Sequence, residues 1–141
     1  MVKVLYTATA TATGGRDGQV ATSDGILDVK TSTPLELGGP GGAFTNPEQL
    51  FAAGYAACFD SALNLVIRKS KIATGVTAVT AHVGLGQNGE GGYGLAVTLD
   101  VLVPGTGQAA AEELVAKAHQ VCPYSNATRN NVEVTINTRV S

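Results

Sequence analysis

Two cysteines are the residues of this sequence best suited to chemistry. Cys58 lies in the middle of a very apolar segment that begins at Asn46, and Cys122 stands directly before Pro123, at the end of a second helical pattern. A thiolate is a nucleophile, and a second thiol can close a disulfide with the oxidised form of the first. The pair therefore offers one candidate nucleophile, Cys58, and one candidate resolving thiol, Cys122.

A nucleophilic Cys58 would need a cationic partner. Burial raises the pKa of a thiol, and Cys58 lies too far into its predicted helix to benefit from the helix dipole. Arg16, in the glycine-flanked turn Gly14–Gly18, is the first candidate, and Arg129 is the alternative. The alternative for Cys58 is an inert core residue. The alternative for Arg16 is a solvent-exposed charge in a turn that does not contact the thiol.

Glu48 could orient such an arginine through a planar two-point contact. Glu48 precedes Cys58 by ten residues, which corresponds to about 15 Å along a regular helix. The two side chains cannot meet in one chain, so a Glu48 that serves this thiol must come from a partner chain. The alternative is that Glu48 only complements the positive end of its own helix.

The other motifs predict no further chemistry. Cys58, Cys122, His82 and His119 contain no local pair of metal ligands, so we expect no metal site and two structural histidines. The run Gly84–Gly89 matches the pattern G-x-G-x-x-G. It leads from a strand into a hairpin rather than into a helix, so we expect no dinucleotide site.

Length and composition restrict the class of protein. A chain of 141 residues fits a single domain, 1–141, that needs no permanent disulfide or metal. Charged residues make up 14% of the chain, below the usual value of about 25%, so we expect another subunit to cover part of the surface. A net charge of -2 and an aromatic content of 5% argue against nucleic acid as a partner.

The amino terminus resembles neither a signal peptide nor a membrane span, because threonine and alanine alternate there. We therefore expect a cytoplasmic protein with no membrane partner. In a reducing compartment, two cysteines are more often reactive or buried than permanently bridged.

The hydrophobic periodicity predicts an α+β fold with mainly antiparallel sheets and a long central helix. Asn46 is a suitable N-cap, Pro47 suits the first helical position, and Gln49 fits a capping box. The predicted helices cover 47–69 and 110–121, and the predicted strands cover 4–12, 20–23, 26–30, 76–85, 93–103 and 132–136.

Four segments together closely resemble the organic hydroperoxide resistance proteins of the osmotically inducible protein (OsmC) superfamily. They agree in residue type, order and spacing across nearly the whole chain, and they are Gly14–Gly18, Glu36–Gly39, Asn46–Phe59 and Val121–Arg129. The resemblance implies an intertwined homodimer with two active sites at the subunit interface. It also favours a reactive Cys58 over an inert one.

By this resemblance, Cys58 is the peroxidatic thiolate and Cys122 is the resolving thiol. Arg16 activates Cys58 and binds the peroxide, and Glu48 holds Arg16. The implied enzyme is a peroxidase that reduces organic hydroperoxides through a Cys58 sulfenic acid and a Cys58–Cys122 disulfide. A dihydrolipoyl group on a lipoylated protein is the implied reductant, and no bound cofactor or metal is required.

The apolar residues around Cys58 predict a preference for alkyl or fatty-acid hydroperoxides over hydrogen peroxide; they are Leu50, Phe51, Tyr55 and Phe59. One competing interpretation is a redox sensor or binding protein whose thiols react with oxidant without turning over. Another is a passive dimeric module with inert thiols.

Overall fold

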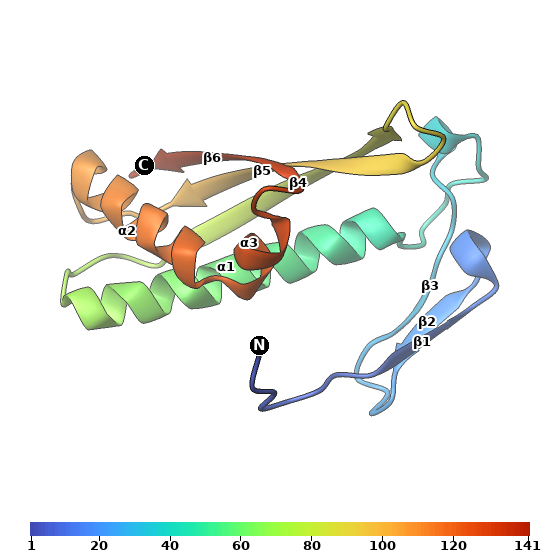
Figure 1. Ribbon diagram of the computed structural model, residues 1–141, viewed down its shortest axis with the longest axis horizontal. Coiled ribbons are helices and arrows are strands. Elements are labelled where there is room, and N and C mark those ends of the chain that lie inside the picture. Colours follow the sequence, from blue (N-terminus) through green and yellow to red (C-terminus); the bar gives the residue numbers. More distant parts are fainter. The chain divides into compact units, whose positions relative to one another are not determined.

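The computed structural model describes residues 1–141, which form two compact units (Figure 1). The N-terminal unit is Met1–Leu50, and the C-terminal unit is Phe51–Ser141. The N-terminal unit contains an antiparallel three-stranded sheet in the order β1-β2-β3, followed by a long loop. Its elements are β1 (Ala10–Thr13), the 3-10 helix η1 (Gly15–Asp17), β2 (Gln19–Thr22), β3 (Asp28–Lys30) and the 3-10 helix η2 (Leu35–Leu37).

The first predicted strand, over 4–12, is wrong in extent. β1 pairs with β2 only from Ala10 opposite Thr22 to Thr13 opposite Gln19, because β2 is four residues long. The predicted strands 20–23 and 26–30 leave only Asp24 and Gly25 between them, but the loop is longer, since β2 ends at Thr22 and β3 begins at Asp28. The Asp24 carboxylate accepts hydrogen bonds from the Thr22 hydroxyl and the Ile26 backbone N–H, at 2.7 and 3.0 Å, which stabilises a longer loop between β2 and β3.

The N-terminal unit has no hydrophobic core of its own. Its only buried residues are Thr31 and Ser32. Many of its large apolar side chains are exposed, Leu5 at 93% and Ile26 at 87% among them, together with Val4, Tyr6, Leu35 and Phe44. Exposed apolar patches of this kind are typical of surfaces at which proteins contact other molecules.

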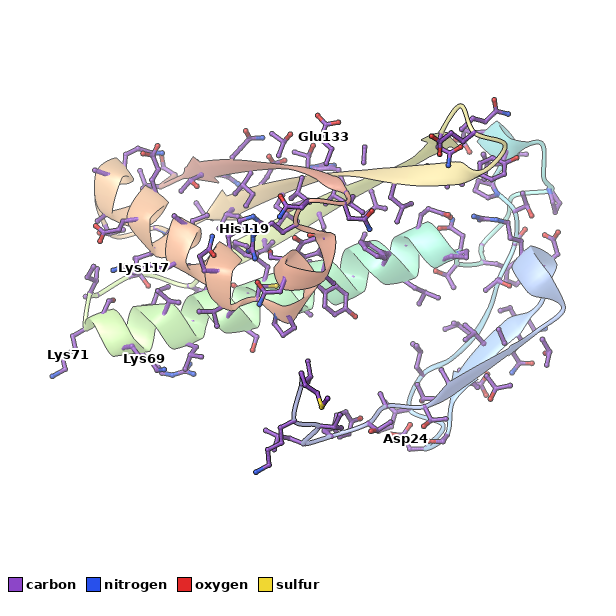
Figure 2. The ribbon with its side chains drawn as sticks, viewed as in Figure 1. Asp24, Lys69, Lys71, Lys117, His119 and Glu133 are labelled. Carbon is purple, nitrogen blue, oxygen red and sulfur yellow. The ribbon has the colours of Figure 1, made fainter.

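The predicted long helix is confirmed as α1, Pro47–Ser70. Asn46 caps it, because the Asn46 side-chain oxygen accepts the Gln49 backbone N–H at 2.8 Å. The reciprocal half of the capping box does not form, since Gln49 instead accepts the Thr45 hydroxyl at 2.8 Å. The helix ends before Lys71, which adopts a left-handed φ of 59°. Lys69 and Lys71 lie at this exposed end of α1 (Figure 2).

The C-terminal unit combines α1 from Phe51 onward with a three-stranded sheet in the order β4-β5-β6, while the first turn of α1 belongs to the N-terminal unit. The strands are β4 (Ala78–Gln87), β5 (Tyr93–Leu102) and β6 (Glu133–Arg139), and the further helices are α2 (Gln108–Val121) and α3 (Pro123–Thr128). β4 and β5 form the predicted antiparallel hairpin, whereas β6 pairs parallel to β5. The chain therefore reaches β6 by a crossover that contains α2 and α3.

The short helix α3 is absent from the prediction, which ended the second helix at Pro123. Pro123 does end α2, but it also occupies the first position of α3. A proline is well tolerated there because the N–H that it lacks has no intrahelical partner at that position. Pro123 therefore both prevents α2 from continuing and begins α3.

The core of the C-terminal unit lies between the sheet and the helices, with α1 and α2 on one face of the sheet (Figure 1). The core-facing residues of β5 are fully buried or nearly so, whereas the side chains on the opposite face of β4 and β6 are exposed. The core is formed by Tyr55, Phe59, Ala62, Leu63, Val66, Val97, Leu99, Val101, Val103, Ala111, Leu114, Val115, Ala118 and Cys122.

α1 is also the one helix whose length and composition would suit a membrane span, with a mean hydropathy of 1.5 over its most apolar window. The core helix of a globular protein meets the same criterion. α1 packs into such a core through Tyr55, Phe59 and Leu63, which are all fully buried.

Candidate active site

The two thiols lie together in the C-terminal unit. Cys58 is on α1, and Cys122 is the N-cap of α3. Both are free thiols, Cys122 fully buried and Cys58 partly exposed. Their Sγ atoms are 3.6 Å apart, with the Cys122 thiol donating to the Cys58 sulfur. A disulfide bond is about 2.05 Å long, so a small movement of either residue would close the bridge.

The first turn of α3 supplies a backbone donor to each sulfur. Pro123 has no N–H, so the first two backbone donors of α3 are those of Tyr124 and Ser125. The Tyr124 N–H forms a hydrogen bond with the Cys58 sulfur, and the Ser125 N–H donates to Cys122 Sγ at 3.5 Å. The position of α3 therefore affects both thiols at once.

The surroundings of Cys58 in this unit favour the neutral thiol. Burial raises the pKa of Cys58, the Tyr124 backbone N–H lowers it, and the neighbouring Cys122 raises it again. Arg129, the alternative activating cation, is engaged elsewhere. Its guanidinium donates to the His119 carbonyl at 2.5 Å and to the Asn126 side chain at 2.7 Å.

Aromatic rings pack beside the thiols. Phe51, Tyr55 and Tyr124 have ring centroids 5.8 to 6.2 Å apart. Gly54 makes room for them, because a Cβ atom at this position would lie 3.0 Å from the Tyr124 hydroxyl oxygen. Of the apolar residues predicted to surround Cys58, Tyr55 and Phe59 are fully buried in the core.

A buried polar cluster beside Cys122 is absent from the prediction. Tyr55, Ser125 and Thr128 are buried, and their hydroxyl groups bond to one another and to the His119 ring. Figure 2 labels His119 on α2. One feature of the sequence could have indicated this cluster. Ser125 and Thr128 are three residues apart, and this spacing places two side chains on one face of a helix.

Arg16 and Glu48 lie together in the N-terminal unit. The Arg16 guanidinium donates to both carboxylate oxygens of Glu48, at 2.9 and 2.6 Å, with side-chain exposures of 34% and 15%. The hydrogen bond from Arg16 is the main reason that the pKa of Glu48 is lowered. The charged pair is therefore the stable form at neutral pH.

The turn that carries Arg16 is fixed from both sides. The Asp17 carboxylate accepts the Thr33 backbone N–H at 2.8 Å and the Thr33 hydroxyl at 3.1 Å. The Gly18 N–H donates to the Thr31 hydroxyl oxygen at 3.0 Å. A side chain at Gly18 would collide with the Thr13 carbonyl, so the turn requires glycine at this position.

The histidines both have partners within the protein. His82 Nε2 lies 2.8 Å from an Asp100 carboxylate oxygen, and His119 Nδ1 lies 2.8 Å from the Ser125 hydroxyl. No group of three or more His, Cys, Asp or Glu side chains is arranged to hold a metal ion. The four predicted site residues form two pairs: the thiols of Cys58 and Cys122 are in contact, and Arg16 forms an ion pair with Glu48.

Known proteins match this chain along almost its full length. The family model described as OsmC-like protein matches residues 39–137. The organic hydroperoxide resistance protein of Xanthomonas axonopodis pv. citri is 58% identical over 135 residues, which cover 95% of this chain and 94% of the relative. The organic hydroperoxide resistance protein OhrA of Bacillus subtilis is 49% identical over 144 residues, covering 96% and 97%.

Solved structures give the same result. The organic hydroperoxide resistance protein of Elizabethkingia anophelis superimposes with a TM-score of 0.96 at 55% identity, covering 99% of this chain and 100% of the other. OhrB of Bacillus subtilis gives a TM-score of 0.87 at 42% identity, covering 96% and 100%. The matched sequence and the shared fold agree, and the chain belongs to the organic hydroperoxide resistance proteins of the OsmC-like family.

Proposed function

We propose that the protein is a cysteine-based peroxidase that reduces organic hydroperoxides to alcohols. The observation that carries this proposal is the 3.6 Å separation of the Cys58 and Cys122 sulfurs. Two free thiols at this distance can store the two electrons that a peroxide needs and can release them as a disulfide bond. The printed names of the relatives support a hydroperoxide as the substrate.

In the first step, the Cys58 thiolate attacks the terminal oxygen of the hydroperoxide. The O–O bond breaks, the alkoxide leaves and takes up a proton to become the alcohol, and Cys58 becomes a sulfenic acid. Cys58 suits this role better than Cys122 because it is partly exposed, whereas Cys122 is fully buried.

In the second step, the Cys122 sulfur attacks the sulfenic sulfur of Cys58. The S–S bond forms, the S–OH bond breaks, and the hydroxide leaves as water with the proton from Cys122. A dihydrolipoyl group of a lipoylated protein then reduces the disulfide through a mixed disulfide and is itself oxidised to the cyclic form. This reductant follows from the family resemblance of the sequence.

The Arg16–Glu48 pair supplies the positive charge that the surroundings of Cys58 lack. An arginine close to a thiol favours the thiolate by about 1–3 pKa units. Glu48 precedes Cys58 by ten residues of the same helix, so the pair serves the Cys58 of a second copy of the chain. The exposed apolar residues of the N-terminal unit support this intertwined homodimer, because the partner would bury them.

Turnover of cumene hydroperoxide with excess dihydrolipoamide tests the proposal. The wild-type protein should consume many equivalents of peroxide, and Cys58→Ser should consume none. Cys122→Ser should consume one equivalent per chain and then stop, because the sulfenic acid has no partner. Wild-type consumption that stops at one equivalent would instead identify a thiol sensor that reacts without turning over.

A further inference from the structure

The hydroxyl cluster beside Cys122 contains a hydrogen-bond chain whose direction can be deduced by counting protons. Four contacts link its members. His119 Nδ1 lies 2.8 Å from Ser125 Oγ, and Ser125 Oγ lies 2.8 Å from the Tyr55 hydroxyl. The Tyr55 hydroxyl lies 3.1 Å from Thr128 Oγ1, which donates to the Ser125 carbonyl at 3.2 Å.

Three hydroxyl groups provide three protons, because each donates only once. One assignment satisfies all four contacts at once: Thr128 donates to the Ser125 carbonyl, Tyr55 donates to Thr128, and Ser125 donates to Tyr55. The fourth hydrogen bond needs a proton from His119. His119 therefore carries a proton on Nδ1 and is the first donor of the chain.

The surroundings of His119 favour the neutral ring. Burial, followed by the positive charge of Arg129, lowers the pKa of His119. A neutral imidazole carries its proton on one nitrogen only, so His119 is held as the Nδ1–H tautomer. No buried side-chain nitrogen or oxygen atom in the protein lacks a hydrogen-bond partner, so removing one member takes a hydrogen bond from each of its neighbours.

The chain joins the three helices that surround the sulfurs. His119 belongs to α2, Tyr55 precedes Cys58 on α1 by three residues, and Ser125 is the residue of α3 whose N–H faces Cys122. Tyr124, whose N–H faces Cys58, lies next to Ser125 and packs against the Tyr55 ring. The Ser125 hydroxyl thus connects α3 to α2 through His119 and to α1 through Tyr55.

We propose that His119, Ser125 and Tyr55 are positioning residues for disulfide formation, with the His119 Nδ1–H as the first donor. The inference rests on the proposed function. As Cys122 loses its proton and attacks Cys58, negative charge develops on its sulfur, and the Ser125 N–H stabilises that charge only while α3 stays in place. The network therefore acts mainly on the second step, because in the first step the proposed main partner of the Cys58 thiolate is the Arg16 guanidinium and the Tyr124 N–H makes a smaller contribution.

The experiment measures the two steps separately in single turnovers with one equivalent of cumene hydroperoxide. Peroxide loss reports the first step, and quenched mass spectrometry reports the sulfenic acid, the disulfide and the sulfinic acid. Ser125→Ala and His119→Gln should slow disulfide formation about tenfold, the effect of one lost hydrogen bond, while the first step stays within about twofold. More sulfinic acid should accumulate, since the sulfenic acid survives longer.

His119→Asn is the conservative variant, because its amide nitrogen can occupy the position of Nδ1, whereas the amide of glutamine reaches the position of Nε2. His119→Asn should restore disulfide formation to within about threefold of wild type, a smaller loss than that of a full hydrogen bond. Gln120→Ala, at the exposed neighbouring position of α2, is the surface control. Nitrogen-15 spectra of the reduced wild-type protein should show the Nδ1–H tautomer of His119 at neutral pH.

Three results would overturn the inference: an Nε2–H tautomer, wild-type disulfide formation in both Ser125→Ala and His119→Gln, or an equal slowing of both steps. An equal slowing would mean general damage to the fold. Failure of the proposed function looks different, because the wild-type protein itself would then form no Cys58–Cys122 disulfide with hydroperoxide.

Discussion

Arg16 and Glu48 form a two-point ion pair, with both carboxylate oxygens of Glu48 accepting from the Arg16 guanidinium at 2.9 and 2.6 Å. The carboxylate fixes the plane of the guanidinium, which a single hydrogen bond would leave free to rotate. The proposed role of Arg16 requires such control, because it must meet both a thiolate and a peroxide. The pair is therefore the first target for mutation.

Replacing Glu48 should reduce peroxide reduction through the loss of this orientation. We expect Glu48→Ala to lower kcat/KM for cumene hydroperoxide by about 10- to 100-fold, the range for lost hydrogen bonds between charged groups. Glu36→Ala is the matched control, since Glu36 is an exposed acidic residue of the same unit. Equal rates for Glu48→Ala and wild type would remove Glu48 from the mechanism.

The pH dependence of stability should report the same ion pair. The pKa of Glu48 is lower in the folded protein than in the unfolded chain, mainly because of the hydrogen bond from Arg16. The pair therefore stabilises the fold above the unfolded pKa of about 4.3, and this stabilisation is lost as the pH falls through the lower folded value. Urea unfolding of wild type and Glu48→Gln should show a difference at pH 7 that shrinks in acid. A difference that persists unchanged in acid would contradict the assignment.

Removing Arg16 should make Cys58 harder to ionise. In the C-terminal unit, burial raises the pKa of Cys58, so the proposed reactivity depends on the guanidinium. We expect Arg16→Ala to raise the Cys58 pKa by about 1–3 units, measured by the ultraviolet absorbance of the thiolate in Cys122→Ser protein. Arg68→Ala, at an exposed position near the end of α1, serves as the control. An unchanged titration in Arg16→Ala would refute activation by Arg16.

Mixed dimers should reveal whether the site is shared between chains. Glu48→Ala and Cys58→Ser chains are each impaired alone, but a dimer with one of each contains one site with both residues intact if they act across the interface. Activity should then recover to about half of the wild-type value per dimer, as expected for independent sites. If confirmed mixed dimers show no recovery, the two residues do not act across the interface.

Much of the fold follows from local sequence patterns. Asn46 and Pro47 marked the start of α1, and the alternation of apolar residues marked β4 and β5. The prediction of a strand over 4–12 was wrong in extent, because alternation predicts which face a side chain occupies but not whether a partner strand exists. Residues 4–9 belong to the predicted strand and yet pair with no strand.

The site was only partly predictable for a related reason. Motif resemblance pointed to Cys58, Cys122, Arg16 and Glu48, and the structure pairs them as thiol with thiol and acid with base. The hydrogen-bond chain of His119 and Ser125 depends on three helices meeting, which no local pattern encodes. The short helix α3 was hidden as well, because Pro123 gives the same signal for the end of one helix and the start of the next.

The crossover from β5 to β6 has a consequence for how the protein is made. Cys122 lies within this connection, and α2 packs against β6. During synthesis, Cys58 emerges from the ribosome well before the final strand that completes the sheet. A growing or truncated polypeptide therefore carries an oxidisable sulfur whose companion is not yet held beside it, and oxidation of such a sulfur proceeds toward the irreversible acids. Rapid completion and folding of the carboxyl-terminal third would therefore shorten the time during which Cys58 lacks its neighbour Cys122.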